Sequence, residues 1–79
     1  MLNLNRTNTK LNFTDHAKFR LLERSVSTED IKATIRNSDI SVPRPGGKTL
    51  ARKRFKEYEL MVVYAKKNND YRIITVIKR

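Results

Sequence analysis

The only histidine of the chain lies four residues before an arginine, and a second arginine follows at the same spacing: His16, Arg20 and Arg24. In a helix these spacings place the three side chains within roughly 80° of one another on one side of the axis. An imidazole titrates near neutral pH and a guanidinium stays charged, so the stripe combines a proton carrier with two fixed cations. This is the chemistry required at a phosphate group.

Cleavage of RNA is one reaction that such a stripe can serve. The 2′-hydroxyl attacks the adjacent phosphorus and the 5′-oxygen leaves, which requires a base, an acid and cations around the phosphorane, without a metal ion. His16 is the candidate acid or base, and the planar fork of Arg20 suits phosphate oxygens. The alternative stays open that His16 packs at a helix–sheet seam and that Glu23 neutralises Arg20. Arg24 is more typical of a surface or ion-paired arginine.

A second cluster of charge lies in the middle of the chain, where six cations and no acid occur: Arg44, Lys48, Arg52, Lys53, Arg54 and Lys56. In a strand, Arg52 and Arg54 point to the same side. We expect Arg44, Lys48, Arg52 and Arg54 to contact a nucleic-acid backbone. A solvated edge strand, whose charges prevent aggregation, is the alternative.

The last two predicted strands supply three further candidates. Thr75 is expected to share a face with Ile73 and Ile77, where its hydroxyl could bond the scissile phosphate or His16, although threonine is also an ordinary strand residue. Tyr64 could stack on a base or act as an acid, or could pack half-buried. Lys78 is either a further phosphate contact or part of a charged tail.

The composition bounds the size of the protein and the kind of partner that it attracts. The 79 residues include 18 Lys and Arg against 8 Asp and Glu, which gives a formal net charge of +10. A chain of this length forms one domain with a small core, and its charge attracts polyanions. Cysteine is absent and there is one histidine, so we expect no metal site and no cofactor. No apolar run approaches the ~20 residues of a membrane span, and we expect a cytoplasmic protein without membrane contact.

The elements that position these residues follow from capping and turn signals. Residues 1–10 are expected to be flexible or weakly extended, and residues 11–79 form the domain. Thr14 is the predicted N-cap of a helix over 15–24, and Ser27 caps a second helix that ends at 37–39. The run 43–47, which is rich in proline and glycine, is predicted to be a loop. Strands are predicted over 49–55, 59–66 and 71–78, with a turn at 68–70.

This order predicts an α+β fold, in which two N-terminal helices pack on one side of a small antiparallel sheet of three or four strands. The consecutive apolar residues at 60–63 and 73–77 indicate strands that are covered on both faces, or one face that awaits a partner.

A resemblance to known proteins is carried by five stretches: Phe13–Ala17, Arg20, Glu23–Arg24, Val26–Ile31 and Tyr71–Val76. They resemble the pattern of a family of small domains that is similar to the ribonuclease toxins of the barnase–colicin–RelE (BECR) fold, which include RelE, HigB and BrnT. The resemblance implies two helices followed by a curved antiparallel sheet, RNA cleavage without a metal ion, and often an antitoxin partner. Carried over by position, it places His16, Arg20 and Thr75 at the catalytic site.

Three hypotheses follow. The leading one is a ribonuclease of toxin type that has RNA and an acidic antitoxin as partners. A non-catalytic RNA- or DNA-binding module on the same scaffold is the second, because one histidine leaves the second proton carrier unassigned. The third is a small protein-interaction subunit. Whether the protein forms a homodimer stays open.

Overall fold

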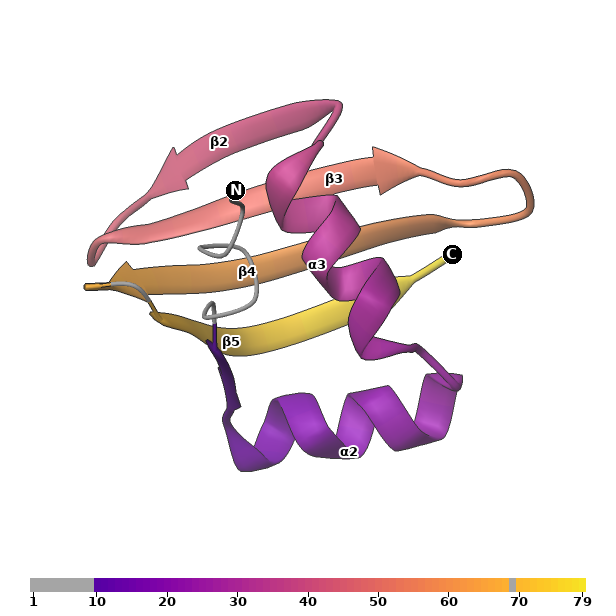
Figure 1. Ribbon diagram of the computed structural model, residues 1–79, viewed down its shortest axis with the longest axis horizontal. Coiled ribbons are helices and arrows are strands. Elements are labelled where there is room, and N and C mark those ends of the chain that lie inside the picture. Colours follow the sequence, from indigo (N-terminus) through magenta and orange to yellow (C-terminus); the bar gives the residue numbers. More distant parts are fainter. Residues whose placement is uncertain (1–9, 69) are drawn as a thin grey trace, which may run out of the picture.

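The described part of the chain forms an α+β fold in which a short strand and two helices precede four strands (Figure 1). The computed structural model describes residues 10–68 and 70–79. The elements are β1 (Lys10–Phe13), α2 (Asp15–Arg24), α3 (Thr28–Arg36), β2 (Ile40–Arg44), β3 (Lys48–Arg54), β4 (Glu59–Lys67) and β5 (Asp70–Lys78). Of the predicted flexible segment 1–10, residues 1–9 lie outside the described residues and Lys10 begins β1.

Among the described residues, the sheet has five strands in the order β1-β5-β4-β3-β2. Strands β2 to β5 are joined as antiparallel neighbours, but β1 pairs with β5 in parallel. The prediction of an antiparallel sheet of three or four strands was therefore wrong in strand number and in one direction. The parallel pair arises because β1 enters beside the last strand, and α2 continues along the same edge of β5.

Strand β2 is the strand that the sequence did not predict. The predicted loop over 43–47 was wrong at its start, because Pro43 pairs with Thr49 and Arg44 pairs with Lys48. The connection is shorter, and Gly46 and Gly47 carry it at φ values of 83° and 72°, which favour glycine. Proline is tolerated in β2 because this strand lies at the edge of the sheet, where a missing N–H breaks no central ladder.

Both helices begin where the caps predict. The Thr14 hydroxyl accepts a hydrogen bond from the amide of Ala17, and the Ser27 hydroxyl accepts one from the amide of Asp30, each at 3.1 Å. These bonds satisfy backbone donors that a helix start leaves free. The carboxylate of Asp30 accepts a hydrogen bond from the Tyr58 hydroxyl, which joins the start of α3 to the β3–β4 turn.

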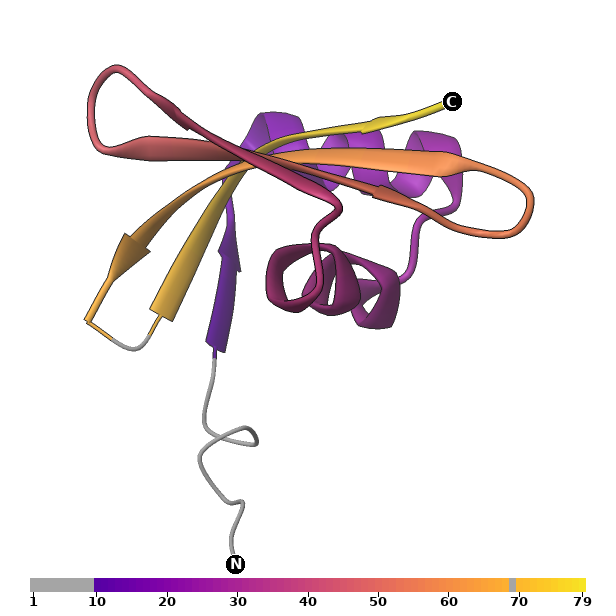
Figure 2. The ribbon, with the colours of Figure 1, turned by 90° about the horizontal axis from the view of Figure 1, so that it is seen from above.

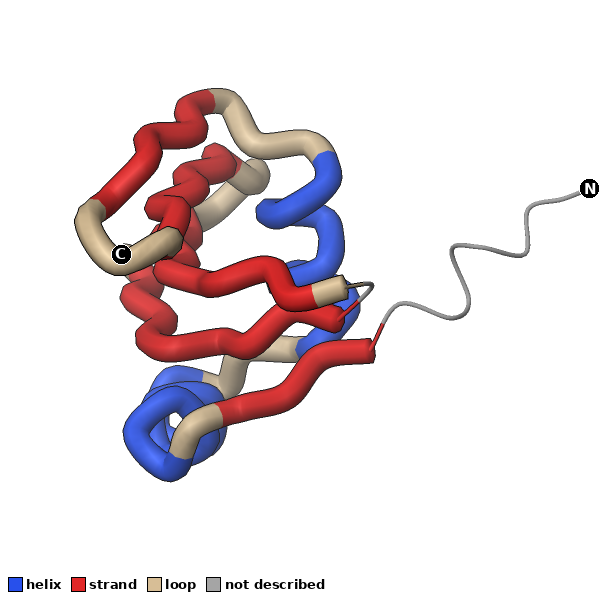
Figure 3. The backbone as a smooth tube through the Cα atoms, turned by 90° about the vertical axis from the view of Figure 1, so that its left-hand side faces the viewer, coloured by secondary structure: helices blue, strands red, loops and turns tan. Residues whose placement is uncertain are grey.

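The two helices take different positions around the sheet. Helix α3 lies across one face and contacts β3 and β4, whereas α2 lies along the β5 edge and contacts β5 and β1 (Figures 1 and 2). Figure 3, which views α2 end-on, shows the two helices apart from each other. Buried side chains fill the space on the α3 side: Ala17, Val26, Ile31, Leu60, Val62, Ile73 and Val76. We call the other side of the sheet the open face, because neither described helix covers it.

A β-bulge interrupts the pairing of β4 with β5. Val63 pairs with Thr75 and Tyr64 pairs with Ile73, so Ile74 is the extra residue. Ile73 and Val76 are both buried in the core, and the bulge accordingly turns Ile74 and Thr75 to the open face. The expectation that Thr75 shares a face with Ile73 was wrong, because strict alternation fails at this residue.

Candidate functional site

One row of cross-strand partners crosses the whole open face. Arg44 pairs with Lys48, Lys48 with Ala65, Ala65 with Arg72, and Arg72 with Asn12. Directly paired residues project from the same face of a sheet. The row therefore holds three cations from three strands, with the small Ala65 between Lys48 and Arg72. We call these five residues the basic row.

A second row lies beside the basic row and is apolar apart from one hydroxyl. It consists of Val42, Leu50, Val63 and Thr75, which are successive partners across β2 to β5. Val42 keeps 42% of its surface exposed. We call these four residues the apolar row. The open face thus places a line of charge and a line of hydrocarbon side by side.

Three adjoining hollows follow the basic row. The first is lined by Asn12, Phe13, Thr14, Lys67, Asn68, Asp70 and Arg72; the second by Thr14, Lys48, Ala65, Arg72 and Ile74; and the third by Arg44, Pro45, Lys48, Val63, Ile74 and Thr75. Neighbouring hollows share residues, so together they form one path that we call the basic groove. Its lining combines four cations with a single carboxylate, and this balance favours an anionic ligand.

Thr14 fixes one wall of the basic groove. Its amide donates to the carbonyl of Ile73 at 3.1 Å, and its hydroxyl donates to the carbonyl of Ile74 at 3.1 Å. The same hydroxyl accepts the amide of Ala17 and so caps α2. One side chain therefore connects β1, the start of α2 and the bulge in β5.

The structure brings Thr75 to the predicted cations. The hydroxyl-bearing side chain lines the third hollow together with Arg44 and Lys48. All three were predicted site residues, and they come from three different strands. A phosphate in this hollow would meet two cations and a hydroxyl, which are the groups that bind phosphate oxygens.

The predicted stripe of His16, Arg20 and Arg24 on α2 lies outside the basic groove. His16 is exposed and lies in the first turn of α2, two residues after Thr14 in the groove wall. Arg20 is half-buried, and its Nη1 lies 3.3 Å from Glu23 Oε1, so the neutralising ion pair weighed from the sequence is present. Within residues 10–68 and 70–79, no hydrogen bond joins His16, Arg20 and Thr75. His16 and Arg20 line none of the three hollows.

Comparison with known proteins identifies the family of the chain. The model of the family described as Domain of unknown function (DUF4258) matches residues 13–78, which is most of the chain. The chain is a member of the DUF4258 family. The comparisons with the curated proteins and with the solved structures give no match. Apart from Asn12, the residues of the basic groove lie within the matched part of the DUF4258 domain.

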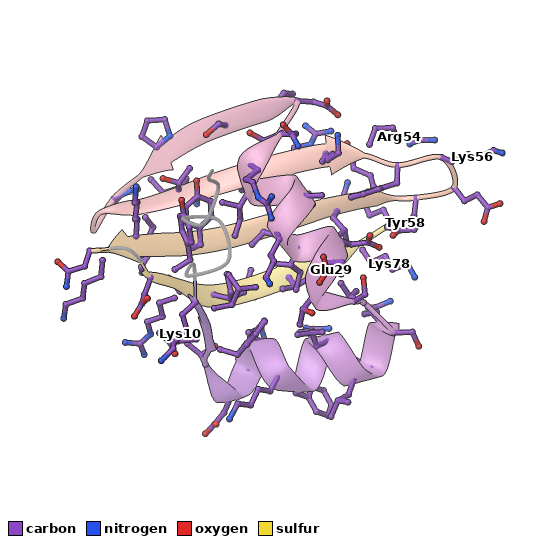
Figure 4. The ribbon with its side chains drawn as sticks, viewed as in Figure 1. Lys10, Glu29, Arg54, Lys56, Tyr58 and Lys78 are labelled. Atoms are coloured by element: carbon purple, nitrogen blue, oxygen red, sulfur yellow. The ribbon has the colours of Figure 1, made fainter. Side chains whose placement is uncertain are left out.

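The other two predicted arginines of the DUF4258 domain lie on the open face at a distance from the basic row. Arg52 pairs with Met61 one row beyond the apolar row, and its Nη2 lies 2.9 Å from Glu59 Oε2. Arg54 is exposed, and its backbone amide donates to Asp39 Oδ2 at 2.7 Å. Arg52 is thus engaged in an ion pair, whereas the guanidinium of Arg54 points to solvent at the far end of the sheet (Figure 4).

Two predicted contacts lie on the α3 side of the sheet. Tyr64 packs edge-on against Tyr71, with ring centroids 5.3 Å apart, and burial raises the pKa of its hydroxyl. The ammonium group of Lys78 lies 4.6 Å from the centre of the Tyr58 ring and donates to the carbonyl of Arg24 at 3.3 Å (Figure 4). Neither Tyr64 nor Lys78 lines the basic groove.

Thr14, as a wall of the groove, and the cations Lys67 and Arg72 were not among the predicted site residues. Arg72 alternates with the buried Ile73 in β5, and this alternation is visible in the sequence. In the structure Lys67 pairs with Asp70, which places Arg72 opposite Ala65, whereas the predicted turn at 68–70 would have placed it opposite Lys66. The alternation is therefore the signal that could have found Arg72.

Two further properties of the described residues concern metals and membranes. No group of three or more His, Cys, Asp or Glu side chains in this part of the chain is arranged to hold a metal ion. None of its helices has the length and apolar character needed to span a bilayer.

Proposed function

We propose that this DUF4258 domain binds RNA in the basic groove and cleaves it by attack of the 2′-hydroxyl, as a metal-independent ribonuclease of toxin type. The observation that carries the proposal is the meeting of Thr75 with Arg44 and Lys48 in one hollow that continues toward Arg72. RNA is the polyanion proposed because its 2′-hydroxyl supplies the nucleophile for the reaction.

The charge of the groove supports binding of a phosphodiester chain. Arg44, Lys48 and Arg72 project from β2, β3 and β5, with Ala65 of β4 between the last two, so a phosphodiester chain that crosses these strands meets three cations without any rearrangement of the sheet. Each phosphate that a cation neutralises releases bound counterions, which makes binding favourable and dependent on salt. The same fixed cations stabilise the extra negative charge that develops on the phosphorane.

The proposed roles at the reacting phosphate follow from position. Arg44 and Lys48 hold the phosphate oxygens, and Thr75 orients the same group by hydrogen bonding, while Arg72 holds a neighbouring phosphate. His16 is the proposed acid or base because it is the sole imidazole of the chain and follows the groove wall at Thr14. Arg20 contributes only if its guanidinium leaves Glu23 when RNA binds.

The order of the elements supports kinship with the BECR ribonucleases. Two helices precede the antiparallel strands β2 to β5, as the resemblance implies. On this proposal the protein acts in the cytoplasm and is held inactive by an acidic antitoxin. Co-purification of the chain with the product of an adjacent acidic reading frame would test the partner.

A non-catalytic RNA- or DNA-binding module is the second candidate. It is favoured by the position of His16, which forms no hydrogen bond to Arg20 or Thr75 within the described part of the chain. The same basic row would serve this function, because backbone binding requires cations and no proton transfer.

An assay of RNA cleavage in the presence of EDTA separates the two candidates. Labelled RNA is incubated with the parent and with His16→Ala, Lys48→Ala and Arg72→Ala, and binding is measured in parallel. Lys56→Ala is the matched control for Lys48→Ala. Lys56 is exposed on the turn that follows the end of β3, whereas Lys48 begins this strand, so the control removes one lysine away from the basic groove (Figure 4).

The ribonuclease proposal expects cleavage that persists in EDTA and falls by about 10²–10⁴-fold in His16→Ala. Lys48→Ala and Arg72→Ala should weaken binding, whereas Lys56→Ala should resemble the parent. RNA binding without cleavage by the parent would refute catalysis and leave the binding module. Equal binding of RNA and DNA would further identify that module as one that does not use the 2′-hydroxyl.

A further inference from the structure

We infer that the open face accepts RNA as a single strand that crosses the sheet, with its phosphates on the basic row and its bases on Val42, Leu50 and Val63 of the apolar row. This inference rests on the proposed RNA binding and specifies the form of the substrate. It follows from the fact that the two rows run side by side across the sheet.

The dimensions of a β-sheet set the scale of this path. Neighbouring strands lie about 4.8 Å apart, so the basic row extends roughly 19 Å from Arg44 on β2 to Asn12 on β1. Residues two apart in one strand are separated by about 7 Å, which is the distance between the two rows. An offset of this size matches the step from a phosphate across its ribose to the base.

The apolar row distinguishes a single strand from a duplex. In a duplex the bases are paired and stacked inside, and the sugar–phosphate chains form the outer surface. The uncharged side chains of Val42, Leu50 and Val63 would then face a charged backbone without a partner. A single strand exposes its bases, and their faces can cover hydrocarbon while the backbone stays on the cations.

Ala65 supplies the place for one phosphate. It lies in the basic row between Lys48 and Arg72, which are two strands and so roughly 10 Å apart. A methyl group does not fill the space between the two long side chains, and the second hollow lies there with Thr14 in its wall. A larger side chain at this position would occupy the hollow without removing any charge.

The test compares the binding of single-stranded and duplex RNA of the same sequence, about 12 nucleotides long, by fluorescence anisotropy at several salt concentrations. The variants are Ala65→Leu, which fills the hollow, and Val42→Ser, which removes hydrocarbon from the apolar row. Leu22→Ser is the matched control, because Leu22 is 82% exposed on α2. Thermal unfolding verifies that each variant is folded.

The inference expects the parent to bind the single strand about tenfold more tightly than the duplex. Ala65→Leu should lower single-strand affinity by about tenfold and Val42→Ser by about threefold, whereas Leu22→Ser should have no effect. Equal affinity for both forms, or Ala65→Leu and Val42→Ser variants that bind like the parent, would overturn this inference and leave RNA binding intact. Failure to bind either form would overturn the proposed function as well.

Discussion

Replacement of Thr14 by alanine tests whether one hydroxyl joins the groove wall to the fold. The hydroxyl accepts the amide of Ala17 and donates to the carbonyl of Ile74, both at 3.1 Å. Loss of a threonine N-cap costs about 1 kcal/mol, and loss of a second, partly buried hydrogen bond costs about 1 kcal/mol more. Thr14→Ala should therefore lower the free energy of unfolding by about 2 kcal/mol, which in a domain of this size lowers Tm by roughly 10 °C.

Urea and thermal unfolding followed by far-UV circular dichroism measure this loss. Thr14→Ser is the matched control, because serine keeps the hydroxyl and both hydrogen bonds, and we expect it to stay within about 0.5 kcal/mol of the parent. An alanine variant as stable as the serine variant would refute the reasoning, since the hydroxyl would then contribute nothing that its neighbours do not supply.

Three other substitutions probe the fold. The pKa of Tyr58 is raised from 10.0 to about 12 by a hydrogen bond to Asp30, by burial and by the charge of Asp30. The contribution of this interaction to the free energy of unfolding is therefore present below pH 10.0 and is lost as the pH rises through about 12. Tyr58→Phe should therefore be less stable at neutral pH, and a pH series of unfolding curves should show that its deficit narrows over this range. Gly46→Ala should cost about 1 kcal/mol in urea unfolding because of the positive φ at this residue. Ile31→Ala should cost about 2–5 kcal/mol in the same assay, because Ile31 is fully buried against the sheet.

Local signals predicted the helices correctly. Thr14 and Ser27 cap α2 and α3 as expected, and α2 spans the predicted 15–24. These features depend on side chains that bond to amides only three residues away, so short stretches of sequence contain all the information. The strands after residue 48 were also predicted to within a residue, because turn residues flank each apolar run.

Features that depend on distant pairing were not predictable in the same way. Strand β2 contains Pro43, which usually indicates a loop, and only its place at the sheet edge makes the proline compatible with a strand. The direction of β1 depends on its pairing with β5, 60 residues later in the chain. The bulge at Ile74 depends on the register between β5 and β4, and no residue type in this segment indicates it.

The residues of the candidate site show the same difference between local signals and distant pairing. The sequence predicted Arg44 and Lys48 in one basic cluster and Thr75 as the relevant hydroxyl, and these three line one hollow. Arg52 was predicted equally well by charge, but in the folded chain it lies diagonally across from Glu59 on the neighbouring strand β4 and forms an ion pair with it. Composition gives the number of cations, whereas pairing across strands determines which of them face a ligand.

The bulge in β5 is better explained by the groove than by the core. If Ile74 were deleted, Ile73, Thr75 and Val76 would alternate regularly and the two buried side chains would keep their places. The deletion would, however, remove the carbonyl that accepts the Thr14 hydroxyl and a side chain that lines two hollows. Bulges are frequent beside active sites because they redirect side chains. A variant that lacks Ile74 should therefore fold but lose RNA binding, and retained binding would show that the groove is not the site.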